Sequence, residues 1–426
     1  MIGVMIASFV VFAVFSMPVA VALGLATVVA VYFFSDYSLL TVAQRMISGV
    51  DSYTLLAIPL FILTGRLMNE GGITDRIFDF SRKCVGHIRG GLGHVNVMAS
   101  MIFAGMSGSA VADAGGLGQV ELKVMNDQGY PREFSAAITA VSSCIGPIIP
   151  PSIPFVMYAA IAEVSPGRLL LSGLLPGLLM GLSLMVAIYI MSFFKQFPQQ
   201  EKKAAIRERW LSFRSALLPL LTPVIIMGGI MGGIFTPTEA SAVAAIYSAV
   251  LGIFVYKSIK LKNIPDILIE TVITTAIVVF IMACSSSFSW LLIMKKVANA
   301  LSVFVMSVTS SKFLIMLILN LVMLALGCFM EAGVLITLLT PLFLPIAKLL
   351  NIDLYQFGVI MVMNLMIGVA TPPVGMSLYV VSKLGDVSIE KMAKPVFILL
   401  IPLVVTLLLV TYFPGFSTAL PNLLLR

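Results

Sequence analysis

The sequence predicts an all-α polytopic membrane protein with two inverted-topology repeats, each containing a re-entrant helical hairpin and a helix broken at a Pro-Pro pair. Three observations predict this fold. Only 11% of the 426 residues are charged and 60% are apolar, whereas soluble domains average about 25% charged residues. Apolar stretches long enough to cross a bilayer recur along the whole chain. The two Pro-Pro dipeptides lie in the same local sequence, 222 residues apart.

The first 34 residues form one apolar stretch. No Lys or Arg precedes Arg45, so the stretch lacks the basic segment that begins a secretory signal. As a single helix it would reach about 50 Å at 1.5 Å per residue, although the hydrocarbon core of a bilayer is only about 30 Å thick. Because proline breaks a helix, Pro18 is expected to divide the stretch into two short or tilted helices.

Further apolar stretches follow. Two of them, near 95–127 and 317–349, contain glycines and polar residues near their middles, which predicts hairpins instead of single spans. We expect a first repeat over 1–194, a cytoplasmic basic connector over 195–216 and a second repeat over 217–426. The other spans are expected near 53–69, 135–162, 169–194, 216–234, 239–257, 266–294, 355–383 and 395–413.

The repeats are indicated by a duplicated motif. Ile145-Gly146 precedes one Pro-Pro pair and Ile367-Gly368 precedes the other, with three residues between glycine and proline in both. The same offset of 222 residues pairs one hairpin with the other, and Gly105 with Gly327. Two structural repeats are the economical interpretation, with broken helices over 135–162 and 355–383.

Charge predicts the orientation. If the amino terminus is outside and the repeats are inverted, 19 of the 26 Lys and Arg residues lie on the inner side and seven lie outside, as the positive-inside rule requires. The first hairpin is then cytoplasmic and the second periplasmic, the symmetry of a secondary transporter. The net charge of +7 does not indicate nucleic-acid binding, because no extended basic patch with interleaved aromatic residues accompanies it.

The Pro-Pro motif has a chemical consequence. A proline cannot donate to the carbonyl four residues earlier, so Pro150 is expected to free the Gly146 oxygen and Pro372 the Gly368 oxygen. Pro151 and Pro373 similarly free the oxygens of Pro147 and Val369. Unpaired carbonyls inside a bilayer are costly, and a bound monovalent cation is a natural partner. The alternative is that Gly and Pro only kink tightly packed helices.

Hydroxyl groups lie near both breaks in the sequence. Ser107 and Ser109 supply hydroxyl oxygens beside Gly105, and Thr371 lies just before the second Pro-Pro pair. Acidic residues inside membrane segments are functional candidates by default. Asp113 either accepts hydrogen bonds from a solute or caps local backbone amides. Glu239 follows a helix start and is expected to cap it, whereas Glu331 is a possible proton carrier.

At these residues the sequence resembles the large membrane (M) subunit of the tripartite ATP-independent periplasmic (TRAP) transporters, over essentially the whole chain. The resemblance is carried together by IPLFILTGRLM at 58–68, SGSAVADAGGLG at 107–118, GPIIPPS at 146–152, GIFTPTEASAVA at 233–244 and GVATPPVG at 368–375. Within the family, the chain is most similar to the sialic acid type. Because no small-subunit sequence precedes Met1, we expect an unfused large subunit.

The resemblance implies a Na⁺-driven importer of an organic acid, sialic acid (N-acetylneuraminate), in the bacterial inner membrane. It implies two partners, a small four-helix membrane subunit and a periplasmic substrate-binding protein, and an elevator motion of a transport domain against a scaffold. Carried over by motif, one Na⁺ site would use Gly105, Ser107, Gly146, Ile149 and Pro150, and a second would use Gly327, Gly368, Thr371 and Val374. Ser109 and Asp113 are the leading substrate contacts.

Other functions remain open at this point. Within transport, the alternatives are a C4-dicarboxylate or other carboxylate TRAP transporter, and a divalent-anion/Na⁺ symporter that needs no binding protein. Outside that class, a channel would pass ions without solute. An intramembrane enzyme would need a nucleophile with a base or a set of metal ligands, which two histidines and four isolated cysteines do not suggest.

Overall fold

The computed structural model describes residues 1–15, 17–194, 197–198 and 202–425. Every regular element in this part of the chain is a helix. Six of the helices there are long and apolar enough to cross a membrane, or seven if the bent pair Leu39–Ser48 and Tyr53–Glu70 is one span. The predicted all-α membrane fold is therefore confirmed.

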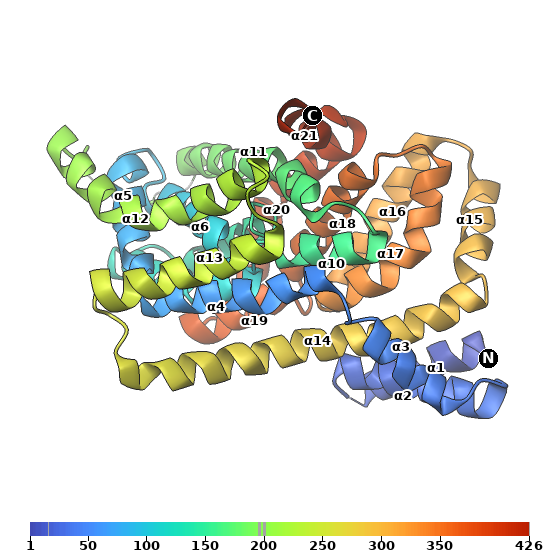
Figure 1. Cartoon of the computed structure of the whole chain (residues 1–426). Coiled ribbons are helices and arrows are strands. Elements are labelled where there is room, and N and C mark those ends of the chain that lie inside the picture. Colours follow the sequence, from blue (N-terminus) through green and yellow to red (C-terminus); the bar gives the residue numbers. More distant parts are fainter. Residues whose placement is uncertain (16, 195–196, 199–201, 426) are drawn as a thin grey trace.

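The amino-terminal part begins with two helices on either side of Pro18, α1 (Ile2–Val14) and α2 (Val19–Phe34), as predicted. Next come α3 (Leu39–Ser48), a 3₁₀ turn η1 (Tyr53–Leu56), α4 (Ala57–Glu70) and α5 (Ile73–Val85). Figure 1 shows α1, α2 and α3 gathered at one end of the long α14, where α2 and α3 pack against it.

The predicted first hairpin consists of α6 (Leu92–Ser107), the short α7 (Ala110–Gly115) and α8 (Leu117–Asp127). The first broken helix follows as α9 (Arg132–Ser142), the 3₁₀ turn η2 (Ser143–Ile145) and α10 (Ile153–Ala162), and it is interrupted at the Pro-Pro pair. The single span α11 (Pro166–Phe194) completes this half. Because a proline at the break removes the i→i−4 bond, the break arises locally.

The second half contains matching elements. The second hairpin is α16 (Lys312–Gly327) with α17 (Ala332–Leu349), and the second broken helix is α18 (Leu354–Val369) with α19 (Met376–Gly385). The start of α18 lies 222 residues after that of α9, and both Pro-Pro peptide bonds are cis. The inverted relation of the halves stays a prediction. The remaining elements are α12 (Ile206–Met231), α13 (Pro237–Val250), the π-helical turn η3 (Leu251–Val255), η4 (Leu261–Asn263), α14 (Ile264–Met294), α15 (Val297–Val308), α20 (Ile389–Tyr412) and α21 (Gly415–Leu424).

Two segments differ from the sequence prediction. The predicted connector over 195–216 is helical from Ile206 onward, because α12 begins there; residues 195–196 and 199–201 of that connector lie outside the described residues. The stretch 295–312, which none of the predicted spans includes, contains the helix α15. Both segments contact neighbouring helices, since α12 packs on α5 and α15 packs on α17, and tertiary contacts of this kind stabilise helices that local signals do not predict.

The two broken helices lie at the centre of the largest apolar core. Nearly all residues of α9 and every residue from Gln356 to Val369 of α18 are buried. The breaks also touch each other, because the Cys144 thiol donates to the Met366 carbonyl at 3.0 Å and the Ser143 hydroxyl donates to Ser377 at 3.2 Å. Cys144 and Met366 are themselves 222 residues apart.

The charge-based orientation makes a direct prediction for the membrane topology. A cysteine placed at Lys203, before α12, is expected to react with a membrane-impermeant maleimide only after the cytoplasmic side is opened, because 19 of 26 basic residues then lie inside. A cysteine at Glu163, between α10 and α11, should react in intact cells and serves as the control. Labelling of the Lys203 position in intact cells would contradict the orientation.

Candidate functional site

A cavity of about 730 Å³ lies against the tip of the first hairpin. Its wall is formed by parts of α4, α7, α10, α14 and α17 and is mostly apolar. Such a volume is typical of a small-molecule site. The polar or charged residues of the wall include Arg66, Asn69, Glu70, Asp75, Ser107, Ser109 and Glu331.

The tip of the first hairpin contacts the first Pro-Pro break through backbone. Gly108 adopts a left-handed conformation with φ +60°, and a β-carbon there would lie 2.7 Å from the Pro151 carbonyl oxygen. The Ile153 amide donates to the Gly108 carbonyl at 3.4 Å. Only glycine accepts this backbone conformation and close approach without strain, so the residue holds hairpin and break together.

The residues predicted for the first ion site are brought together at this contact. A β-carbon at Gly105 would lie 3.8 Å from the Pro150 carbonyl oxygen, and one at Gly146 would lie 3.6 Å from the Ser109 carbonyl oxygen. Within the described residues, the buried Ser107 hydroxyl has no hydrogen-bond partner. Ile149 is also buried, next to Pro150. The Ser109 carbonyl also accepts from the Asp113 amide at 3.0 Å. Carbonyl and hydroxyl oxygens at a broken helix are the groups with which transporters hold Na⁺.

One of the carbonyls expected to be free here is already occupied. The Ser152 hydroxyl, which caps α10 by accepting from the Phe155 amide, donates to the Pro147 carbonyl. The prediction that Pro151 leaves this oxygen without a donor is therefore wrong, because a serine just after the break replaces the missing amide.

The second predicted ion site forms where the second hairpin meets the second break. Gly327 and Gly368 are in direct backbone contact, since a β-carbon at Gly368 would lie 2.6 Å from the Gly327 Cα. The Thr371 hydroxyl donates to the Ile367 carbonyl at 2.7 Å, and its amide donates to the Gly368 carbonyl at 2.8 Å. The Gly368 oxygen is thus not free, contrary to the prediction, because the chain tightens into a turn after α18. Its second lone pair is still available to an ion. Val374 lies just beyond this break and is half exposed.

Asp113 lies behind the cavity wall rather than on it. Its side chain is only 2% exposed, and in the described part of the chain neither carboxylate oxygen makes a hydrogen bond. The alternative that it caps local amides is not found, since the Ser109 hydroxyl accepts from the Ala112 amide instead. Ser109 itself lines the cavity. An ionised carboxylate that is buried without a partner is costly. The role of Asp113 as a substrate contact stays a prediction.

A second buried acid, Glu121, was not singled out by the sequence. Asn96 of α6 donates to Glu121 and to Thr139, both at 2.8 Å. Ser142 donates to the Asn96 amide oxygen at 2.7 Å, and Ser100 donates to Ser142 at 3.1 Å. This network joins the first hairpin to α9, and polar residues spread over three helices give no compact motif in the sequence.

Arg66 was also missed as a site residue. The sequence identified it only as one of the inner-side cations, whereas the structure places it on the cavity wall, 2.6 Å from the Glu270 carboxylate of α14. An arginine inside an apolar span is the signal that would have found it.

Glu239 and Glu331 are the other two acidic residues that the sequence singles out, and they lie in different settings. Glu239 caps α13, because its carboxylate accepts from the Thr236 amide and hydroxyl, both at 2.8 Å, while its own amide donates to the Thr236 hydroxyl. The predicted capping is confirmed. Glu331 precedes α17 and faces the cavity.

The amino-acid sequence matches one family of known proteins. A family model described as "Tripartite ATP-independent periplasmic transporter, DctM component" matches residues 6–416. The sialic acid TRAP transporter large permease protein SiaM of Vibrio cholerae is 46% identical over 386 residues, which are 90% of each chain. The permease protein SiaT of Haemophilus influenzae is 42% identical over 90% of this chain and 62% of its own. The C4-dicarboxylate large permease protein DctM of Pseudomonas aeruginosa is 42% identical over 94% of each chain.

Two solved structures share the fold at low sequence identity. The YdaH transporter of Alcanivorax borkumensis has a TM-score of 0.63 at 13% identity and covers 88% of both chains. MtrF of Neisseria gonorrhoeae has a TM-score of 0.59 at 11% identity and covers 94% of both. At such low identity the likeness concerns the fold alone.

Proposed function

The chain belongs to the DctM component family of tripartite ATP-independent periplasmic transporters, and from this premise we propose that it imports sialic acid by Na⁺ symport. It is a large permease subunit, a transport protein and not an enzyme, and a multi-pass protein of the bacterial inner membrane. A periplasmic binding protein delivers the solute, and a small membrane subunit covers part of the apolar surface.

The observation that carries Na⁺ coupling is the paired backbone contact of hairpin and break. Gly108 meets Pro151 on one side, and Gly327 meets Gly368 on the other. Each contact brings carbonyl and hydroxyl oxygens together at a helix break, and transporters hold Na⁺ with such groups. The first contact borders the cavity through Ser107 and Ser109, so ion and solute would bind as neighbours. An elevator motion of this unit belongs to the same proposal.

The choice of solute rests on the relatives and on the cavity. Two of the similar permeases are named for sialic acid, and one at 42% identity is named for C4-dicarboxylates. Among the described residues of the cavity wall, Arg66 is the one cationic side chain, while Glu70, Asp75 and Glu331 are acidic. One cation with several hydrogen-bond acceptors suits a hydroxylated monocarboxylate better than a dicarboxylate, because a second carboxylate would meet like charges.

The test is reconstitution of the chain with its small subunit in liposomes. With an inward Na⁺ gradient and solute-loaded binding protein outside, sialic acid uptake is expected, and succinate carried by its own binding protein should not compete. Uptake driven equally by a proton gradient without Na⁺ would contradict the ion assignment and make Glu331 the candidate carrier. Uptake without the binding protein would favour the symporter alternative, and ion flux without solute would favour a channel.

A further inference from the structure

The first turns of α12 extend beyond the part of the helix needed to cross the bilayer. Its 26 residues reach about 39 Å, against a hydrocarbon core of about 30 Å. Residues 214–231 carry a single charge, on Arg214, and account for nearly the whole core. Residues 206–213 therefore lie at the level of the lipid headgroups, on the side that the charge distribution predicts to be cytoplasmic.

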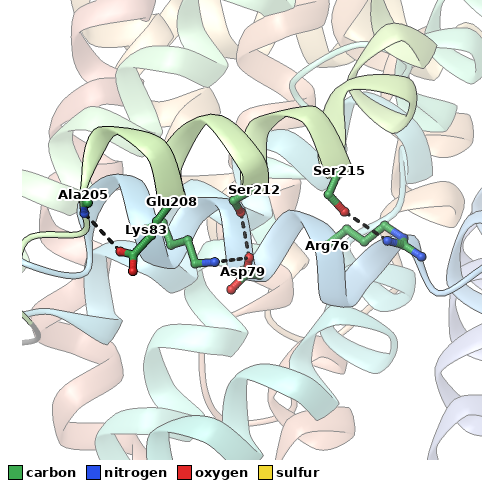
Figure 2. Close-up of polar contacts among 7 residues, drawn as sticks. All are labelled: Arg76, Asp79, Lys83, Ala205, Glu208, Ser212 and Ser215. Atoms are coloured by element: carbon green, nitrogen blue, oxygen red, sulfur yellow. Dashed lines mark hydrogen bonds and ion pairs between the residues drawn. The ribbon is translucent and has the colours of Figure 1, made fainter.

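One face of this extension is docked on α5. Figure 2 shows the Ser212 hydroxyl donating to Asp79 at 2.7 Å, Lys83 paired with the same carboxylate at 3.2 Å, and Arg76 donating to Ser215 at 3.0 Å. Because these contacts all lie on one side of α12, they fix which face of the helix is turned toward α5. Its other faces are directed away from α5.

An apolar face is left uncovered by this docking. Ile206 is 86% exposed, Trp210 63% and Leu211 54%. Tryptophan is enriched at the membrane–water interface, where its ring spans the headgroup region. A helix with such residues on one face and basic residues beside them lies in the interface and contacts acyl chains.

Beside the apolar face lie basic residues for which the described part of the chain shows no ion pair with an acidic residue. In the described part of the chain, the Nε and one terminal nitrogen of Arg209 are buried and make no hydrogen bond. Burial lowers the pKa of His87, and the nearby charges of Arg209 and Lys203 lower it further. Two acidic side chains that the structure describes nearby have other partners, since Glu208 accepts from the Ala205 amide and Asp79 binds Lys83 and Ser212. Buried guanidinium donors without acceptors favour an external anion.

We propose that Arg209, Lys203 and His87 bind the phosphate of an anionic phospholipid of the cytoplasmic leaflet, whose acyl chains lie along Ile206 and Trp210. The protein offers a suitable partner to both parts of such a lipid, because the basic side chains can donate to the phosphate and the apolar face can contact the acyl chains. A neutral zwitterionic lipid matches less well, since its own cation would meet Arg209 and Lys203. This inference does not depend on the transported solute or on Na⁺.

The test compares lipids added to the purified full chain in detergent. Dioleoylphosphatidylglycerol is expected to raise the thermal unfolding midpoint and to bind in native mass spectrometry, whereas dioleoylphosphatidylcholine should do so much less. Each basic residue removed should weaken phosphatidylglycerol binding about fivefold, so the double variant Lys203→Gln and Arg209→Gln should lose most of the effect. Lys260→Gln removes an exposed charge from the same predicted side of the membrane and should change little.

Further variants and ligands test the phospholipid site. Arg209→Lys keeps the charge and should retain part of the binding even if Arg209→Gln does not fold. Equal stabilisation by both lipids, or full binding by the double variant, would overturn the proposal. Equal stabilisation by inorganic phosphate would show that the acyl chains contribute nothing and would overturn the lipid assignment. Trp210→Ala is expected to weaken binding of phosphatidylglycerol without creating phosphate binding.

Discussion

Replacing Gly368 by alanine is expected to remove Na⁺-dependent uptake at ordinary Na⁺ concentrations. The added methyl carbon would lie 2.6 Å from both the Gly327 Cα and its carbonyl carbon, and backbone atoms of two packed helices have no room to move. Overpacking of this kind costs about 1–3 kcal/mol, so the Na⁺ concentration for half-maximal uptake should rise about 5- to 150-fold. Initial uptake rates measured against Na⁺ concentration check this.

Two other glycines make matched comparisons. A β-carbon at Gly327 would lie 3.2 Å from the Gly368 Cα, a less severe contact, and Gly327→Ala should therefore have a smaller effect. Gly228 of α12 has open space in the direction of a β-carbon, so Gly228→Ala should leave the Na⁺ dependence unchanged. If the folded Gly368→Ala protein showed the same Na⁺ dependence as Gly228→Ala, the second ion site would not lie at this contact.

Replacing Arg66 by glutamine is expected to weaken solute recognition strongly. Among the residues that the structure describes, Arg66 is the one cationic side chain of the cavity wall, and a hydrogen bond to a charged group is worth about 1.5–3 kcal/mol. The solute concentration for half-maximal uptake should therefore rise roughly 10- to 150-fold, with a smaller change in the maximal rate. Uptake measured against the concentration of loaded binding protein checks this.

A variant of Glu270, the ion-pair partner of Arg66, distinguishes solute recognition by Arg66 from a purely structural role. Glu270→Gln removes the ion pair at 2.6 Å but keeps the arginine in the cavity. If Arg66 recognises the solute carboxylate, Glu270→Gln should leave recognition intact or improve it, because the guanidinium is released. Equal losses in Arg66→Gln and Glu270→Gln would mean that Arg66 serves only to hold α4 against α14.

Several features of the site were predictable because their causes are local. Pro18 divides the amino-terminal stretch, and Pro150 and Pro372 interrupt their helices, since a proline removes a donor wherever it stands. Thr236 and Glu239 form the predicted helix cap because both partners lie within one turn. These effects depend on residues that are close in the sequence.

The sequence prediction was wrong where another group donates to a carbonyl oxygen expected to be free, or where contacts with a distant helix decide the local structure. The oxygens of Pro147 and Gly368 are not free, because Ser152 and the Thr371 amide donate to them. The predicted connector over 195–216 is helical from Ile206, and Ser212 and Ser215 of that helix dock on α5. Arg66 was identified as a marker of orientation and not as a cavity residue, since nothing in its local sequence places it opposite α14.

The sequence by itself determined the membrane class, the broken helices and the pairing of residues 222 apart, because hydropathy and the missing proline donor act locally. Only the tertiary structure decided which groups meet. The contact of Gly327 with Gly368, the burial of Glu121 under Asn96, and the placement of Arg66 on the cavity wall each join segments distant in the chain. Such contacts depend on how whole helices pack, and close packing is a property of all the side chains together.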